Sequence, residues 1–144
     1  MHIITRLIAL LRGRQLMRQF DIVERSIQAL PASGRMKLEA LVKREMSRAA
    51  QCEFPHLYGT SPEQRYFLWG KGTETGIARV LSENLEVRLR GIALWISVAY
   101  HETRESPHPH LQPQHRQLLR ILRELKQSSA RVAVAERWIG SSAA

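Results

Sequence analysis

Apolar residues recur at intervals of three and four positions along most of this 144-residue chain, which is the spacing of one face of an α-helix. The segment from Leu16 to Leu30 shows it most clearly, because its apolar residues follow one another at steps of four, three, four and three. No segment alternates apolar and polar residues strongly enough to compete with this spacing. The pattern predicts an all-α protein, built as a bundle of about five to seven helices.

One predicted helix is apolar over an unusually large part of its circumference. It runs from about residue 85 to residue 102. A helix that is apolar nearly all round is typical of the centre of a bundle, where neighbours cover every side. We therefore expect the other helices to pack around 85–102.

Glycine, proline and serine residues mark where the predicted helices begin and end. Gly13 is expected to interrupt the first helix, and Ser61-Pro62 to begin a short helix that ends at Gly70-Lys71-Gly72. Ser128-Ser129 is expected to cap a separate last helix. The prediction is a single helical domain over residues 1–139, followed by a flexible C-terminal tail over 140–144.

The predicted helical bundle is also strongly basic. The chain has 22 Lys and Arg residues against 13 Asp and Glu residues, a formal net charge of +9, and 18 of the 22 are arginine. A charge of this sign favours polyanions such as nucleic acid, an anionic membrane or an acidic protein. Arginines near the two ends of the chain, together with one lysine, are the candidate polyanion-binding residues: Arg6, Arg12, Arg14, Arg18, Arg116, Arg120, Arg123 and Lys71.

Cysteine usage and hydropathy indicate the compartment in which the protein works. Cys52 is the only cysteine, which suits a reducing compartment, and no window approaches the ~18–20 continuous apolar residues of a membrane span. We therefore expect a cytoplasmic protein without a transmembrane helix, for which peripheral membrane contact is not favoured. No motif for a cofactor is present, and none is predicted.

A proline-rich loop near residues 106–113 and the residues on either side of it carry the candidate catalytic and metal-binding side chains. His101, His108, His110 and His115 lie within fifteen residues and are weak candidates for metal ligands. Prolines restrict how these imidazoles could converge, and no recognised ligand spacing is present, so no metal site is predicted. Arg104 and His110 are weak catalytic candidates for a metal-independent ribonuclease, with His110 as acid or base and Arg104 stabilising a pentavalent phosphate.

Three functions are compatible with the sequence, and we give the most favoured first. The first is a non-enzymatic interaction module that binds an acidic protein or assembles with itself, because the chain is basic and helical and has no complete catalytic set. The second is sequence-independent binding of DNA or RNA through the arginine-rich helix faces. The third is the ribonuclease that would use the 104–110 loop.

Overall fold

The computed structural model describes residues 2–48, 62–105 and 111–143, and every regular element within these ranges is a helix. The all-α prediction is therefore confirmed. The helices are α1 (His2–Gln28), α2 (Ala32–Arg48), α4 (Pro62–Val80), α5 (Leu85–Glu105) and α6 (Gln112–Ala143). Cys52 and residues 106–110 of the predicted proline-rich loop lie outside the described residues, whereas Gln112 and Pro113 at the end of that loop already belong to α6.

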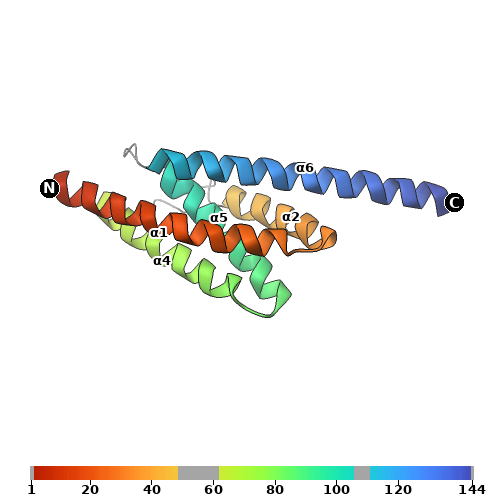
Figure 1. The fold of residues 1–144 in the computed structure, drawn as a ribbon, viewed down its shortest axis with the longest axis horizontal. Coiled ribbons are helices and arrows are strands. Elements are labelled where there is room, and N and C mark those ends of the chain that lie inside the picture. The colour runs from red at the N-terminus through yellow and green to blue at the C-terminus, as the bar shows by residue number, and fades with distance from the viewer. Residues whose placement is uncertain (1, 49–61, 106–110, 144) are drawn as a thin grey trace.

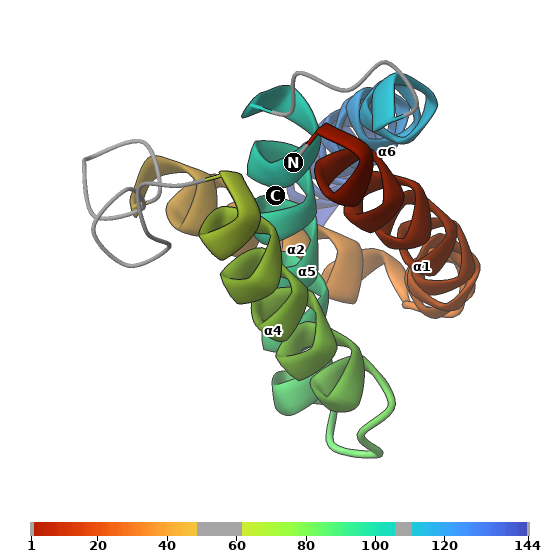
Figure 2. The same ribbon diagram turned by 90° about the vertical axis from the view of Figure 1, so that its left-hand side faces the viewer.

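α5 is the central helix of the bundle, as the sequence predicts. It contacts each of the other four described helices, which surround it in the end-on view of Figure 2. Its side chains at positions 89, 92, 95, 96 and 99 are almost completely buried. Phe20 of α1 meets Trp95 of α5 edge to face, with the ring centroids 4.8 Å apart. This contact joins the apolar face of α1 to the middle of the core.

Two glycines allow α4 and α5 to cross in direct backbone contact. A Cβ added to Gly91 of α5 would lie 2.5 Å from the Cβ of Arg79 and 2.7 Å from the amide nitrogen of Val80. A Cβ added to Gly76 of α4 would lie 2.9 Å from the Cβ of Trp95. At these positions the absence of a side chain is what lets the two helices pack so closely.

The predicted break at Gly70-Lys71-Gly72 is wrong, because α4 runs without interruption from Pro62 to Val80. α1 likewise continues through Gly13, and α6 continues through Ser128-Ser129 to Ala143, which includes most of the segment expected as a tail. Glycine or serine inside a helix costs only up to about 1 kcal/mol, which the packing of a long helix outweighs. The predicted helix start at Ser61-Pro62 does agree with the structure, since α4 begins at Pro62. After Val80 the chain turns, and Asn84 caps α5 by accepting a hydrogen bond from the Val87 amide at 3.2 Å.

The two ends of the chain lie at opposite ends of the longest axis of the molecule. In Figure 1 the N-terminal end of α1 reaches beyond the other described helices on one side, and the C-terminal half of α6 reaches beyond them on the other. The first turns of α1 are therefore covered less by the bundle than its later turns are.

Candidate functional site

Large apolar side chains are exposed along one face of the N-terminal half of α1. Ile3 is 81% exposed, Ile4 61%, Leu7 53% and Leu11 54%. Burying aliphatic side chains is the main driving force of folding, so several of them exposed side by side mark a surface that another molecule covers. We define the outward face of α1 as its exposed residues Ile3, Ile4, Leu7, Leu10, Leu11, Arg14, Met17 and Arg18.

Arginine is the only charged residue type on this face. No Asp or Glu occurs between residues 2 and 20, and Asp21 is the first acidic residue of the chain. Arg14 and Arg18 follow Leu7 and Leu11 at helical spacing, so they continue the same exposed stripe. Arg6 is exposed as well. The outward face is therefore apolar over its first turns and positive over the turns that follow.

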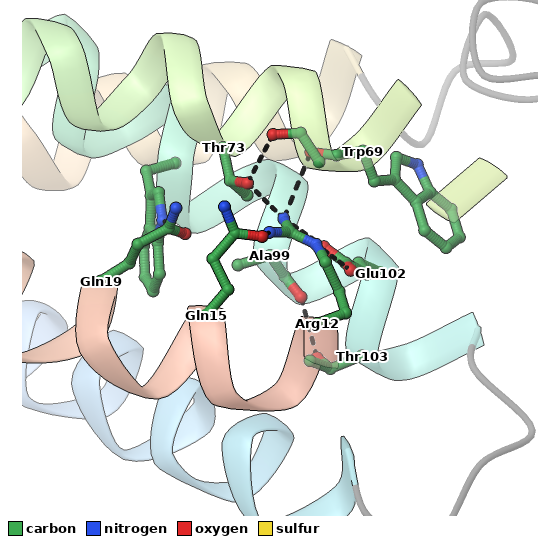
Figure 3. A network of polar contacts seen from close by, with 10 residues as sticks. Arg12, Gln15, Gln19, Trp69, Thr73, Ala99, Glu102 and Thr103 are labelled. Atoms are coloured by element: carbon green, nitrogen blue, oxygen red, sulfur yellow. Dashed lines mark hydrogen bonds and ion pairs between the residues drawn. The ribbon is translucent and has the colours of Figure 1, made fainter. Parts of the chain in front are cut away.

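Arg12 lies on the opposite side of α1 and is buried in an ion pair with Glu102 of α5. Its Nε donates to Glu102 Oε1 at 2.6 Å and its Nη2 donates to Oε2 at 2.9 Å (Figure 3). Arg12 is 5% exposed and Glu102 is fully buried. Arg12 is thus unavailable to a polyanion, which corrects its assignment from sequence to the polyanion-binding arginines.

Further hydrogen bonds extend this ion pair into a network that holds α1 against α4 and α5. The Arg12 guanidinium also donates to Gln15, to the Thr73 hydroxyl and, at 3.4 Å, to the backbone carbonyl of Trp69. The Thr73 hydroxyl lies 3.0 Å from the Gly70 carbonyl. About two turns beyond Arg12 on α1, Gln19 accepts a hydrogen bond from the Trp95 indole at 2.9 Å. Figure 3 shows that Arg12, Gln15 and Gln19 all point from α1 toward the interior.

Burial dominates the electrostatics of Glu102. It raises the pKa of this carboxyl above 4.5, because removal from water disfavours the charged form, while the charge and hydrogen bonds of Arg12 act in the opposite direction. The bidentate contact satisfies both carboxylate oxygens. The network therefore fixes the rotation of α1 about its own axis, and with it the direction in which the outward face points.

The second arginine group lies on the exposed side of α6. Arg116, Arg120 and Arg123 are all exposed. Arg120 forms ion pairs with Glu24 of α1 at 3.1 Å and with Glu124 at 3.9 Å, and Gln117 donates to the same Glu24 oxygen at 2.8 Å. Carboxylates thus neutralise part of this group, whereas the described contacts of Arg14 and Arg18 include no carboxylate.

Lys71 lies within α4, well away from its N-terminus at Pro62. Backbone amides inside a helix are already hydrogen-bonded, so the segment around Lys71 offers no anion-binding cradle of free amides. Lys71 itself remains an exposed cation on α4.

Tyr100, Arg104 and His115 gather where α5 ends and α6 begins. The Tyr100 ring lies 5.2 Å from the His115 ring, centroid to centroid, and the Arg104 guanidinium carbon lies 5.9 Å from the Tyr100 centroid. His115 Nδ1 is 2.9 Å from the buried Thr103 hydroxyl. Burial lowers the pKa of His115 below 6.5, and the charge of Arg104 lowers it further.

The structure separates the four histidines considered as metal ligands. His108 and His110 lie outside the described residues, as does the pairing of Arg104 with His110. His101 is buried and packs edge-on against Tyr100, while His115 is bound to Thr103. Among the described residues, no group of three or more His, Cys, Asp or Glu side chains is placed to hold a metal ion.

Comparison with known proteins gives no guide to the function. No protein-family model matches the chain, and no curated protein or solved structure is significantly similar to it. None of the helices in the described ranges has a stretch long and apolar enough to cross a bilayer.

Sequence reasoning missed Glu102 and His115 as partners of other side chains. Glu102 follows Ala99 by three positions and Trp95 by seven, so helical periodicity places a carboxylate on the buried face of the central helix. A buried carboxylate requires a partner, and this was the available signal. The periodicity does not say which of 18 arginines provides it.

Proposed function

We propose that this protein is an interaction module whose outward face of α1 binds an acidic amphipathic helix of a partner protein. The observation that carries the proposal is the combination of exposed aliphatic side chains and arginines on one helical stripe that carries no acidic residue before Asp21. A partner helix would cover the apolar turns with its own apolar stripe. Its carboxylates would lie opposite Arg14 and Arg18.

A second copy of this chain fits the surface less well. Pairing two outward faces would bring the arginines of both copies to one interface, in a protein whose formal net charge is already +9. Like charges across an interface oppose association. The partner is therefore a molecule of the opposite charge.

Nucleic acid would satisfy the arginines but not the aliphatic side chains. Phosphates bind Arg and Lys, and sequence-independent binding depends on that contact almost entirely. Ile3, Leu7 and Leu11 would stay in water, so their exposure would remain unexplained.

An anionic membrane would cover the apolar turns but not the turns that follow. Arg14 and Arg18 lie on the same stripe as Leu7 and Leu11, so a helix lying flat on a bilayer would direct them into the hydrocarbon. A protein helix that carries Glu at the matching positions has no such conflict.

The test uses a synthetic peptide of about 20 residues, long enough to form a helix, with leucines on one stripe and glutamates beside it. Fluorescence anisotropy measures its binding to the wild type and to the double variant Leu7→Ser/Leu11→Ser. Burial of a leucine contributes roughly 1.5–3 kcal/mol, so the double variant should bind at least about tenfold more weakly. Its thermal unfolding should change little, because both side chains are exposed.

Leu81→Ser/Leu119→Ser is the matched control, since these leucines are 67% and 39% exposed on other parts of the surface. This variant should bind the peptide like the wild type. The proposal is overturned if the wild type does not bind the peptide, or if both double variants bind equally well. It is also overturned if anionic vesicles or RNA bind through Leu7 and Leu11 in place of the peptide.

A further inference from the structure

The cluster of Tyr100, Arg104 and His115 has no part in the proposed binding of a partner helix. It lies at the junction of α5 and α6, whereas the outward face belongs to the N-terminal half of α1. Arg104 is exposed, and Tyr100 and His115 are half-buried, so solvent reaches all three. Among the described residues, none of the three contacts a carboxylate. The three side chains form a polar surface cluster in which Arg104 carries a permanent positive charge. The packing of the bundle does not explain this cluster.

Thr103 determines which nitrogen of His115 carries the proton. The Thr103 hydroxyl is 2.9 Å from the Ala99 carbonyl, four positions earlier, and a carbonyl can only accept. The single hydroxyl proton therefore goes to the backbone, and the Thr103 oxygen is left to accept from His115 Nδ1 at 2.9 Å. His115 is then protonated on Nδ1, and Nε2 is the nitrogen free to take up a second proton.

Tyr100 lies beside both this imidazole and a permanent positive charge. Its ring centroid is 5.2 Å from that of His115 and 5.9 Å from the guanidinium carbon of Arg104, so both basic groups border the same ring. The field of Arg104 acts on His115 and disfavours the imidazolium. An anion between them would reverse that effect, because it would accept from both groups at once.

We propose that Arg104 and His115 form a binding site for a phosphate group. The guanidinium of Arg104 donates two parallel hydrogen bonds to the phosphate oxygens. His115 takes up a proton on Nε2 and donates it in a third hydrogen bond, while Nδ1 stays bound to Thr103. Tyr100 is a positioning residue that keeps both groups in place. The ligand is a phosphate dianion, either inorganic or carried by a nucleotide or a phosphorylated peptide.

Proton NMR of the wild-type protein tests this site through the titration of His115. The His115 resonance, assigned by its absence in His115→Gln, is followed with pH in sodium chloride and in sodium phosphate of equal ionic strength. Bound phosphate should raise the apparent pKa of His115 by about one unit, a tenfold stronger binding of the proton. Separate titrations with adenosine monophosphate and with a phosphoserine peptide show which source of phosphate binds most tightly.

Arg104→Gln is the decisive variant, because Arg104 is exposed and its replacement should leave the fold intact. In chloride it should raise the pKa of His115, since the repelling charge is gone, and it should remove the response to phosphate. Arg90→Gln, at an exposed site earlier in α5, should respond like the wild type. Identical titrations in chloride and phosphate, or an unchanged phosphate response in Arg104→Gln, would overturn the proposal.

Discussion

Arg12 and Glu102 lie ninety positions apart in the chain and form a bidentate ion pair inside the protein, with N–O distances of 2.6 and 2.9 Å. The pair joins the first helix to the central one, and Thr73 of α4 completes it. Because Arg12 points inward, residues half a turn away from it on α1 point outward. The pair thus determines the orientation of the surface that we propose for binding.

Removing one partner of this ion pair should destabilise the protein strongly. In Glu102→Gln the buried guanidinium of Arg12 loses its counter-charge, and the expected loss in the free energy of unfolding is about 3–5 kcal/mol. Urea unfolding followed by circular dichroism measures it. Glu124→Gln is the control, because this glutamate is 68% exposed and its ion pair with Arg120 spans 3.9 Å. Its effect should stay within about 0.5 kcal/mol, and a similar loss in both variants would contradict the structural role of the pair.

Two glycine substitutions should have opposite effects, because Gly91 lies at the close crossing of α4 and α5 and Gly70 does not. Gly91→Ala should destabilise the protein by about 1–3 kcal/mol, because the new methyl group would meet Arg79, Val80 and the Gly76 carbonyl within 2.8 Å. Gly70→Ala should stabilise it by about 0.5–1 kcal/mol, because its Cβ would meet only the Arg12 guanidinium, at 3.9 Å, and alanine favours a helix. Thermal unfolding of both variants checks the pair, and a stabilising Gly91→Ala would show that the helices are further apart.

His115 should make the stability of the protein depend on pH in mildly acidic solution. Its pKa in the folded state lies below 6.5, the ordinary value, so the unfolded chain binds the proton more readily than the folded one. The free energy of unfolding should therefore fall as the pH drops below about 6.5 and recover above it. Urea unfolding at a series of pH values, in buffers without phosphate, measures this dependence. Part of it should disappear in His115→Asn, while an identical slope in wild type and variant would exclude a contribution from His115.

The sequence predicts the helical class and the central helix well, because both depend on local periodicity. Helical spacing of apolar residues over 85–102 is enough to place α5 at the centre. Periodicity does not predict contacts between distant helices, and this explains the errors. The role of Gly76 and Gly91 is to admit a neighbouring backbone, which only the crossing of α4 and α5 reveals. Gly70 and Gly72 favour a break by residue type alone, yet α4 continues through both.

The candidate surface could be predicted only in part, because the burial of a side chain on α1 depends on contacts with distant helices. Arg14 and Arg18 are basic in any fold, and their exposure agrees with expectation. Arg12 is the same residue type and lies only two positions before Arg14, yet its side chain is buried in the ion pair with Glu102. The apolar residues of the first turns resemble those of a buried helix, and only the packing shows that about half the surface of Leu7 and of Leu11 stays exposed.

A charge exchange between the protein and the peptide tests whether the outward face of α1 binds an acidic helix. Two peptides share the same leucine stripe, and one carries glutamates where the other carries lysines. Wild-type protein should bind the glutamate peptide, and Arg14→Glu/Arg18→Glu should lose at least about tenfold in affinity for it while gaining affinity for the lysine peptide. Arg116→Glu/Arg123→Glu, an equal charge change on α6, should retain the preference of the wild type. If the α6 variant loses binding as much as the α1 variant, or if exchanging the charges of Arg14 and Arg18 leaves the preference unchanged, the outward face of α1 is not the binding surface.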